Sequence, residues 1–129
     1  EILMCKRNNN PLKGEWFTPG GRIYKNEKIN FALSRICNVE LGLEQVNTKD
    51  FIPFGAWDHI FDNSIFGENI STHYINLPHY CSLSFKPKIK LDSQHNNFQW
   101  IKLVEIADNE KYHIYMRKYA RYLIDIVKC

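Results

Sequence analysis

Residues 20–43 of the chain read GGRIYKNEKINFALSRICNVELGL, and this stretch decides the fold. Between residues 27 and 41 the apolar residues recur at the i, i+3, i+4, i+7, i+8 spacing of one buried helical face. These residues are Ile29, Ala32, Leu33, Ile36 and Cys37. Gly20 and Gly21 follow a proline and predict a sharp bend, and Gly42 predicts the end of the helix.

Glu40 lies on the apolar face of this expected helix. It is about 20° from Ile29 round a helix of about 3.6 residues per turn. An ionised carboxylate that is buried without a partner costs several kcal/mol, so it is normally neutralised, paired or bound to a metal. Arg35 lies roughly 140° away on the same helix. The position therefore favours a cation from outside the helix, and the alternative is a core Arg or Tyr as the partner.

The rest of the chain predicts strands around this helix. Short segments rich in aromatic and β-branched residues are expected as strands at residues 2–5, 51–61, 72–85 and 98–101. Residues 86–97 are expected to form a loop, and a closing helix is expected from about 109 to 127. Strands interleaved with two helices predict an α/β or α+β domain with helices packed on a sheet.

Length and composition limit the classes of protein. The 129 residues suit one domain, expected over residues 1–129. The net charge of +3 is spread without a run of like charges, so no nucleic-acid partner is expected. The four cysteines form no C-x-x-C pair, which favours a reduced cytoplasmic protein without zinc. No segment has the about 20 apolar residues of a membrane span and no signal peptide is evident, so no membrane partner is expected.

The spacing of Gly21, Glu27, Arg35, Glu40 and Gly42 resembles the Nudix box. That pattern is Gly, five residues, Glu, seven residues, Arg-Glu-aliphatic, any residue, Glu-Glu, any residue, Gly-aliphatic. Two of the glutamates of its second half are replaced here by the aliphatic residues at positions 36 and 39. The resemblance implies an α/β Nudix fold, in which a mixed β-sheet is sandwiched between helices.

The reduced box resembles the GDP-mannose mannosyl hydrolase branch of the family. The likeness continues outside the box and covers most of residues 1 to about 104. The stretches that carry it are 6–9, 14–22, 57–59, 71–74 and 92–100. Members of the branch have one more strand upstream of this region, which is expected to be absent from these residues. The resemblance also implies a homodimer.

The resemblance implies that Mg²⁺ is held by the backbone carbonyl of Gly20, the carboxylate of Glu40 and the side chain of Gln94. These ligands are all oxygens, which Mg²⁺ prefers and which suit zinc less well. Without the resemblance, Gln94 would be interpreted as a solvated loop residue.

Four further residues match catalytic positions of the branch. His95 matches the general base that takes a proton from the attacking water, and the ordinary pKa of histidine suits that role at neutral pH. Arg7, Arg22 and Arg35 match arginines that neutralise the diphosphate. For Arg35 the alternative is that it braces Glu27.

His59 and Tyr74 match residues of the branch that bind the substrate, although each could be a strand residue with only structural contacts. The other histidines are expected to be structural or on the surface, and Trp57 and Trp100 are expected in the core.

The preferred interpretation is a Mg²⁺-dependent hydrolase that cuts a nucleotide sugar, GDP-mannose or a close GDP-hexose, into GDP and free sugar. The resemblance implies attack of water on the anomeric carbon with inversion. One alternative is a conventional Nudix pyrophosphohydrolase that cleaves the phosphoanhydride of a nucleotide sugar or nucleoside triphosphate. The other is a nucleotide-binding module that has lost turnover through its depleted box.

Overall fold

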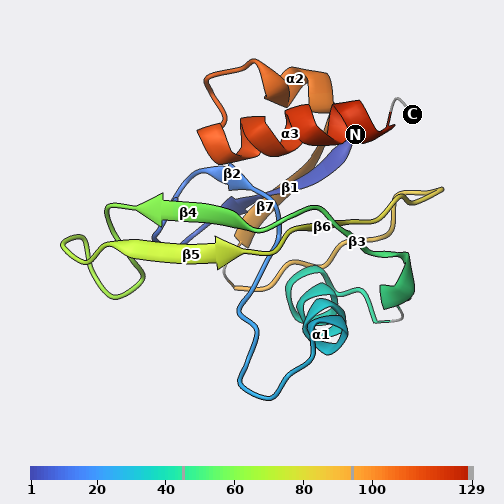
Figure 1. Cartoon of the computed structure of the whole chain (residues 1–129), viewed down its shortest axis with the longest axis horizontal. Helices are drawn as coiled ribbons and strands as arrows, with labels where there is room; N and C mark the ends of the chain where they lie inside the picture. Colours follow the sequence, from blue (N-terminus) through green and yellow to red (C-terminus); the bar gives the residue numbers. More distant parts are fainter. Residues whose placement is uncertain (45, 94, 128–129) are drawn as a thin grey trace.

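A computed structural model of the chain describes residues 1–44, 46–93 and 95–127 (Figure 1). Its strands form three small antiparallel units. The first is a three-stranded sheet in the order β2 (Trp16–Phe17), β1 (Ile2–Arg7) and β7 (His95–Ile101). The other two are the pairs β4 (Trp57–Phe61) with β5 (Thr72–Asn76), and β3 (Ile52–Pro53) with β6 (His79–Tyr80). The helices are α1 (Ile29–Leu41), the 3₁₀ turn η1 (Thr48–Asp50), α2 (Leu103–Ala107) and α3 (Ile114–Val127).

The helices lie on both sides of the strands. Figure 1 shows α2 and α3 together on one side, α1 on the other, and the strands between them. The expected α/β class, with β-structure sandwiched between helices, is confirmed. Among the described residues, no helix has both the length and the apolar character needed to cross a bilayer.

The main core lies between α3 and the three-stranded sheet. The buried face of α3 consists of Met116, Tyr119, Ala120 and Leu123. It belongs to the same cluster as Ile106 of α2 and Met4 of β1, each of which is 1% exposed. Burying a large apolar side chain of this kind contributes about 1.5–3 kcal/mol. This core fixes β1, and with it the strands that carry the candidate site.

The helix predicted over residues 27–41 begins at Ile29. Glu27 lies in the preceding turn, where its carboxylate accepts a hydrogen bond from the Tyr24 N–H at 3.0 Å. Ile29 is 45% exposed, so the buried face is narrower than the apolar spacing predicted. Its buried residues are Ala32, Cys37, Glu40 and Leu41. Gly42 ends the helix in the left-handed conformation, at φ 69°, as predicted.

Four other predicted elements are corrected. Pro53 and Gly55 divide the predicted strand 51–61 into β3 and β4, and Pro78 separates β5 from β6 within 72–85. The last strand begins at His95 and not at Phe98, so the predicted loop is shorter. The short helix α2 was not predicted, and α3 begins five residues later than expected.

Candidate active site

Glu40 is buried near the end of α1, and the structure brings it together with Gly20. Glu40 is 5% exposed, and its Oε2 accepts a hydrogen bond from the Gly20 N–H at 2.9 Å. Burial raises the pKa of the Glu40 carboxyl to about 7, although the Gly20 N–H opposes this rise. The charge of Asp92 raises the pKa further, and that of Arg7 lowers it. The predicted burial of a carboxylate on this helix face is therefore confirmed.

This environment fits a cation. Among the described residues, no Arg or Lys nitrogen lies within 4.0 Å of the Glu40 carboxylate, and its donor is a backbone N–H. A buried carboxyl with a raised pKa is stabilised in its charged form by a nearby positive ion. The contact between the two residues uses the Gly20 N–H, whereas the predicted ligand is the Gly20 carbonyl; this oxygen and the carboxylate are both of the type that suits a hard divalent cation. In the described part of the chain no group of three or more His, Cys, Asp and Glu could hold a metal. Gln94, the third predicted ligand, lies outside the described residues.

A β-bulge sets the direction of His95. Along most of the β1–β7 pair the partners follow one register, in which Lys6 is opposite Asn97, but Arg7 is opposite His95. One extra residue of β7 is therefore accommodated between these pairs, and such a bulge re-aims the side chains beyond it. Directly opposed residues share one face of a sheet. The bulge thus places His95 on the same face as Arg7.

Asp92 orients the His95 imidazole. Nδ1 of His95 lies 2.8 Å from Oδ1 of Asp92, and the His95 side chain is 1% exposed. Because an ionised carboxylate can only accept, Nδ1 donates the proton and Nε2 is the basic nitrogen. Sequence reasoning gave Asp92 no role. Its position three residues before a candidate base was the one available indication.

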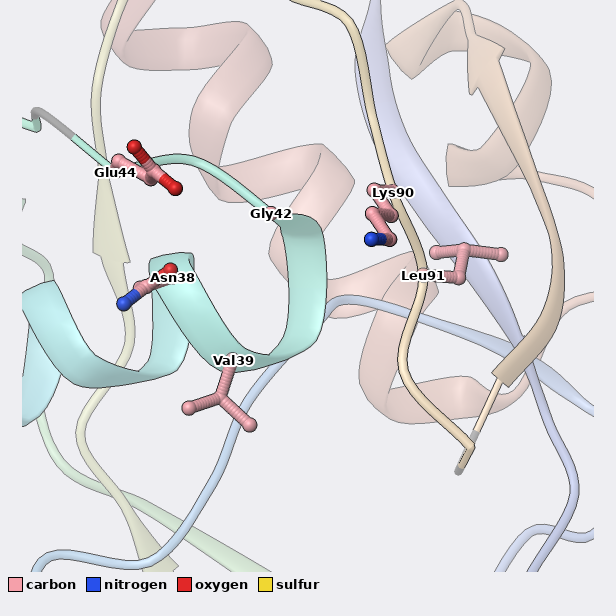
Figure 2. A pocket seen from close by; sticks show the side chains of 6 residues that line it. All are labelled: Asn38, Val39, Gly42, Glu44, Lys90 and Leu91. Atoms are coloured by element: carbon pink, nitrogen blue, oxygen red, sulfur yellow. The ribbon is translucent and has the colours of Figure 1, made fainter.

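The segment that carries Asp92 is attached to the end of α1. Lys90 donates its backbone N–H to the Leu41 carbonyl at 2.9 Å. A Cβ added to Gly42 would lie 2.7 Å from the Cβ of Lys90, so only glycine allows this approach. Figure 2 shows Lys90 beside Gly42, next to a hollow of about 280 Å³. The hollow contains none of the predicted site residues. The approach of these two residues, here called the Gly42–Lys90 contact, holds the segment before Asp92 against the end of α1.

Arg7 interacts electrostatically with both acidic groups, Glu40 and Asp92. Its Nε–H donates to the Pro11 carbonyl at 2.9 Å, which holds the side chain against the turn after β1. Burial lowers the pKa of Arg7, while the charges of Glu40, Tyr74 and Asp92 raise it. The guanidinium is thus close enough to interact with all three. Arg7 links the surroundings of Glu40 with those of Tyr74.

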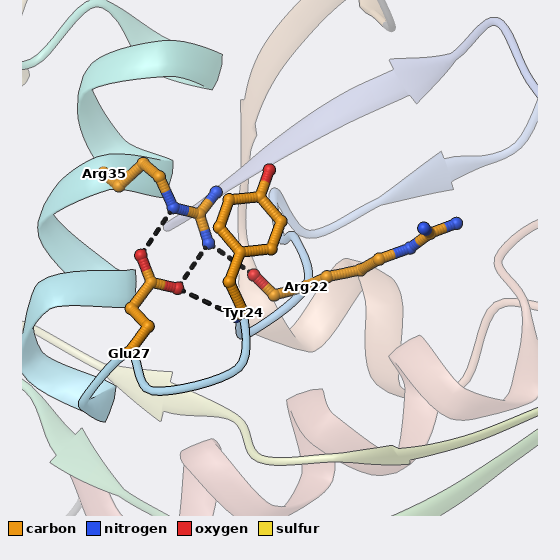
Figure 3. Close-up of polar contacts among 4 residues, drawn as sticks. All are labelled: Arg22, Tyr24, Glu27 and Arg35. Atoms are coloured by element: carbon orange, nitrogen blue, oxygen red, sulfur yellow. Dashed lines mark hydrogen bonds and ion pairs between the residues drawn. The ribbon is translucent and has the colours of Figure 1, made fainter.

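The contacts of Arg35 hold the loop before α1 in place. Its Nε and Nη2 donate to the two carboxylate oxygens of Glu27 at 2.8 and 2.9 Å, and Nη2 also donates to the Arg22 carbonyl (Figure 3). The guanidinium lies 4.0 Å from the centre of the Tyr24 ring. The hydrogen bond from Arg35 lowers the pKa of Glu27 to about 2. These contacts favour the alternative considered for Arg35, in which it holds the loop before α1.

Arg22 and Tyr74 line one cleft. In Figure 3 the Arg22 side chain extends away from the Glu27–Arg35 pair, although its carbonyl points toward Arg35. A shallow cleft of about 340 Å³ lies between Arg22 and the β4–β5 hairpin. Its lining residues are Arg22, residues 64–66 and residues 70–74. We call this the hairpin cleft. Two predicted substrate-binding residues therefore meet in it.

His59 lies apart from this cleft. It is 3% exposed, its Nε2 is 3.0 Å from the Tyr119 hydroxyl, and its ring stacks on Tyr115 at 4.3 Å. Burial lowers its pKa to about 4. Although His59 is opposite Tyr74 in the β4–β5 pair, its contacts are with α3. The structure therefore supports the alternative of a packed strand residue over the predicted substrate contact.

Comparison with known proteins decides the family of this chain. A family model described as NUDIX domain matches residues 1–123. The chain belongs to the Nudix family. This Nudix protein is 32% identical over 118 residues to the low-salt glycan biosynthesis protein Agl8 of Haloferax volcanii, a match that covers 92% of this chain and 70% of the relative.

Solved structures show the same fold. The MutT protein from Methanosarcina mazei Go1 superposes with a TM-score of 0.70 at 19% identity, covering 98% of this chain and 85% of that one. An Ap4A hydrolase from C. elegans, solved as a binary complex, gives a TM-score of 0.64 at 13% identity with the same two coverages. The Nudix fold predicted from the box is thus confirmed.

Family membership supports part of the predicted activity. Nudix proteins are hydrolases of nucleotide-linked substrates and generally use divalent metal ions. In this Nudix protein the box residues divide into two groups. Glu40 points to the buried site with Gly20, whereas Glu27 and Arg35 hold the loop that leads to it.

Proposed function

We propose that this Nudix protein hydrolyses a GDP-hexose, GDP-mannose or a close relative, to GDP and the free sugar. The observation that carries the proposal is the arrangement around Arg7. Arg7 interacts electrostatically with a buried carboxylate, Glu40, and an oriented base, the His95–Asp92 pair, shares its sheet face. This arrangement can neutralise a diphosphate and deprotonate a water beside it.

The step needs a base with a defined free nitrogen. Nε2 of His95 takes a proton from water, the water oxygen forms a bond to the anomeric carbon, and the bond from that carbon to the diphosphate oxygen breaks. The leaving GDP keeps the electron pair, and the sugar carbon is inverted. Asp92 stabilises the imidazolium that forms, because it already accepts the Nδ1–H. The 1% exposure of the His95 side chain separates the base from bulk water.

Charge stabilisation comes from the other side of the site. Arg7 donates to the phosphate oxygens, whose charge grows as the bond to carbon breaks, and Arg22 binds the same diphosphate from the hairpin cleft. Gly20, Glu40 and Gln94 are the residues that would hold Mg²⁺, which supplies further positive charge to the diphosphate when bound. Tyr74 contacts the substrate from the hairpin cleft, and Arg35 keeps the Arg22 backbone in place.

The relative from Haloferax volcanii supports a sugar-linked substrate, since its name places it in glycan biosynthesis. The residues that match the mannosyl hydrolase branch support the choice of carbon as the atom attacked. A homodimer remains part of this proposal through the same resemblance, and a cytoplasmic location through the cysteine pattern of the sequence. Sedimentation of the purified protein tests the dimer.

Hydrolysis in ¹⁸O-labelled water tests the proposal. GDP-mannose is incubated with the protein and Mg²⁺, and both products are analysed by mass spectrometry. We expect the label in mannose and none in GDP. Label in a phosphate of the products would mean attack on phosphorus and a conventional pyrophosphohydrolase. GDP binding without any product would support a binding module.

A further inference from the structure

The loop between β4 and β5 is held by polar contacts of its own. Ser64 and Gly67 exchange backbone hydrogen bonds of 3.0 and 3.2 Å, and the Ser64 hydroxyl accepts from the Phe66 N–H at 3.0 Å. Thr72 donates its hydroxyl to the Asn63 carbonyl at 2.7 Å. The loop conformation therefore does not depend on burying its apolar side chains.

Three large apolar residues of this loop nevertheless line the hairpin cleft while exposed to solvent. Phe66 is 74% exposed, Ile65 51% and Ile70 50%. Single exposed apolar residues are ordinary, but several that line one cleft together indicate a binding surface. Because the loop is fixed without them, their position has no explanation in the packing of the fold.

The same cleft is lined by one cationic residue, Arg22, whose backbone is fixed by the hydrogen bond from Arg35 to the Arg22 carbonyl. Tyr74 lies in the cleft and interacts electrostatically with Arg7, which in turn interacts with Glu40. The cleft thus combines apolar residues with one guanidinium, and Tyr74 connects it electrostatically with Arg7 on the diphosphate side of the proposed site.

A ligand that suits this order has a flat apolar ring at one end and a diphosphate at the other. We propose that Phe66, with Ile65 and Ile70, forms the subsite for the nucleobase of the substrate. The inference rests on the proposed function, since it uses the same site, and it adds the residue that holds the base. Aromatic side chains bind bases by stacking with little dependence on sequence or base identity. Phe66 is therefore a determinant of nucleotide affinity and not of the chemical step.

Calorimetric titration of the full chain with GDP and with inorganic pyrophosphate, at fixed Mg²⁺, tests this inference. The wild-type protein should bind GDP at least about tenfold more tightly than pyrophosphate. Phe66→Ala should weaken GDP binding roughly tenfold, the scale of one lost base–aromatic stack, and leave pyrophosphate binding unchanged. Phe66→Trp should restore GDP binding.

Phe85→Ala is the matched control, because Phe85 is 70% exposed and lies outside the hairpin cleft. It should leave both affinities as in the wild type. GDP affinity within twofold of wild type in folded Phe66→Ala would overturn the inference, as would equal wild-type affinities for GDP and pyrophosphate.

The two proposals fail in different ways. GDP binding does not require turnover, so a Phe66 effect without release of sugar would sink the proposed reaction and keep the base subsite. Hydrolysis of GDP-mannose together with an unchanged GDP affinity in Phe66→Ala would support the proposed reaction and overturn the base subsite.

Discussion

The surroundings of Glu40 and the hairpin cleft differ in how their side chains are held. Around Glu40 the charged groups are buried or half-buried, and the backbone is fixed by the β1–β7 bulge and by the Gly42–Lys90 contact. In the hairpin cleft Arg22, Tyr74 and Phe66 are exposed, and only the backbone beneath them is fixed. Electrostatic interactions are stronger in the first region because water is excluded from it. We infer that the buried region performs the chemical step and that the open cleft provides affinity.

The largest expected effect is that of His95→Ala. Loss of a general base should lower kcat about 10²–10⁴-fold with little change in KM for GDP-mannose. Steady-state kinetics with Mg²⁺ present measure both. His79→Ala is the control, since His79 lies outside the site and bonds its own neighbour, the Leu77 carbonyl. Activity of His95→Ala within a few-fold of wild type would remove His95 from the mechanism.

The second-largest effect on activity is expected for Glu40→Gln. The amide keeps an acceptor for the Gly20 N–H but removes the charge that a metal needs. We expect the rate at saturating substrate to fall at least about tenfold, the scale at which even outer-shell changes act at metal sites. The Mg²⁺ concentration for half-activation should also rise, and chelation should abolish wild-type activity. Glu44→Gln, an exposed acid beyond the same helix, should leave the Mg²⁺ titration unchanged.

Gly42→Ala tests whether the buried region depends on its fixed backbone. A left-handed residue with a side chain costs about 1–2 kcal/mol, and here the new Cβ would also meet Lys90 at 2.7 Å. Gly14→Ala is the matched control, because Gly14 has a φ of +81° and nothing within 4 Å. Chemical denaturation should give a larger loss for Gly42→Ala, and only this variant should lose kcat. Equal losses of stability in both variants, with kcat unchanged, would show that the close contact is not needed.

Arg22→Ala should act mainly on affinity. Removing an exposed guanidinium from the cleft should raise KM roughly tenfold, within the range for a charge-assisted hydrogen bond, and change kcat less. Arg22→Lys should recover part of the loss. Arg121→Ala, which removes an exposed pair with Asp108, is the control. A fall in kcat larger than the rise in KM would place Arg22 with the buried region instead.

Substitution of His59 is expected to have the smallest effect, and this effect is on the stability of the fold and not on activity. Its pKa in the folded protein is lowered to about 4, so below about pH 6.5 the unfolded chain binds a proton that the folded protein does not. Its contribution to stability is present above about pH 6.5 and is lost as the pH falls toward 4. His59→Phe should therefore show a smaller drop in Tm between pH 7 and pH 5 than the wild type. An identical drop would mean that His59 is not the group responsible.

The sequence predicted the features that depend on local spacing. The helix, its end at Gly42 and the buried Glu40 follow from a periodic pattern, and the pairing with Gly20 follows from a family spacing. Asp92 could not be assigned, because its contact with His95 depends on the bulge and on the Lys90 backbone. Arg35 could not be assigned between phosphate and Glu27, since the turn before α1 decides which group it reaches. Whether His59 contacts substrate or packs in the core depends on how α3 packs against β4, and no local sequence pattern predicts this packing.

The bulge between β1 and β7 makes the base depend on the register of the last strand as well as on residue identity. In the regular register, without the bulge, position 96 would lie opposite Arg7 and the imidazole would be carried to the opposite side of the sheet. A relative paired in that way would retain the box, the arginines and a histidine in its alignment, yet it would have no base beside the substrate. Loss of the one extra residue at position 96, by contrast, would leave the histidine opposite Arg7 in a regular ladder. A histidine in the alignment therefore identifies a hydrolase of this type only together with the register of this strand.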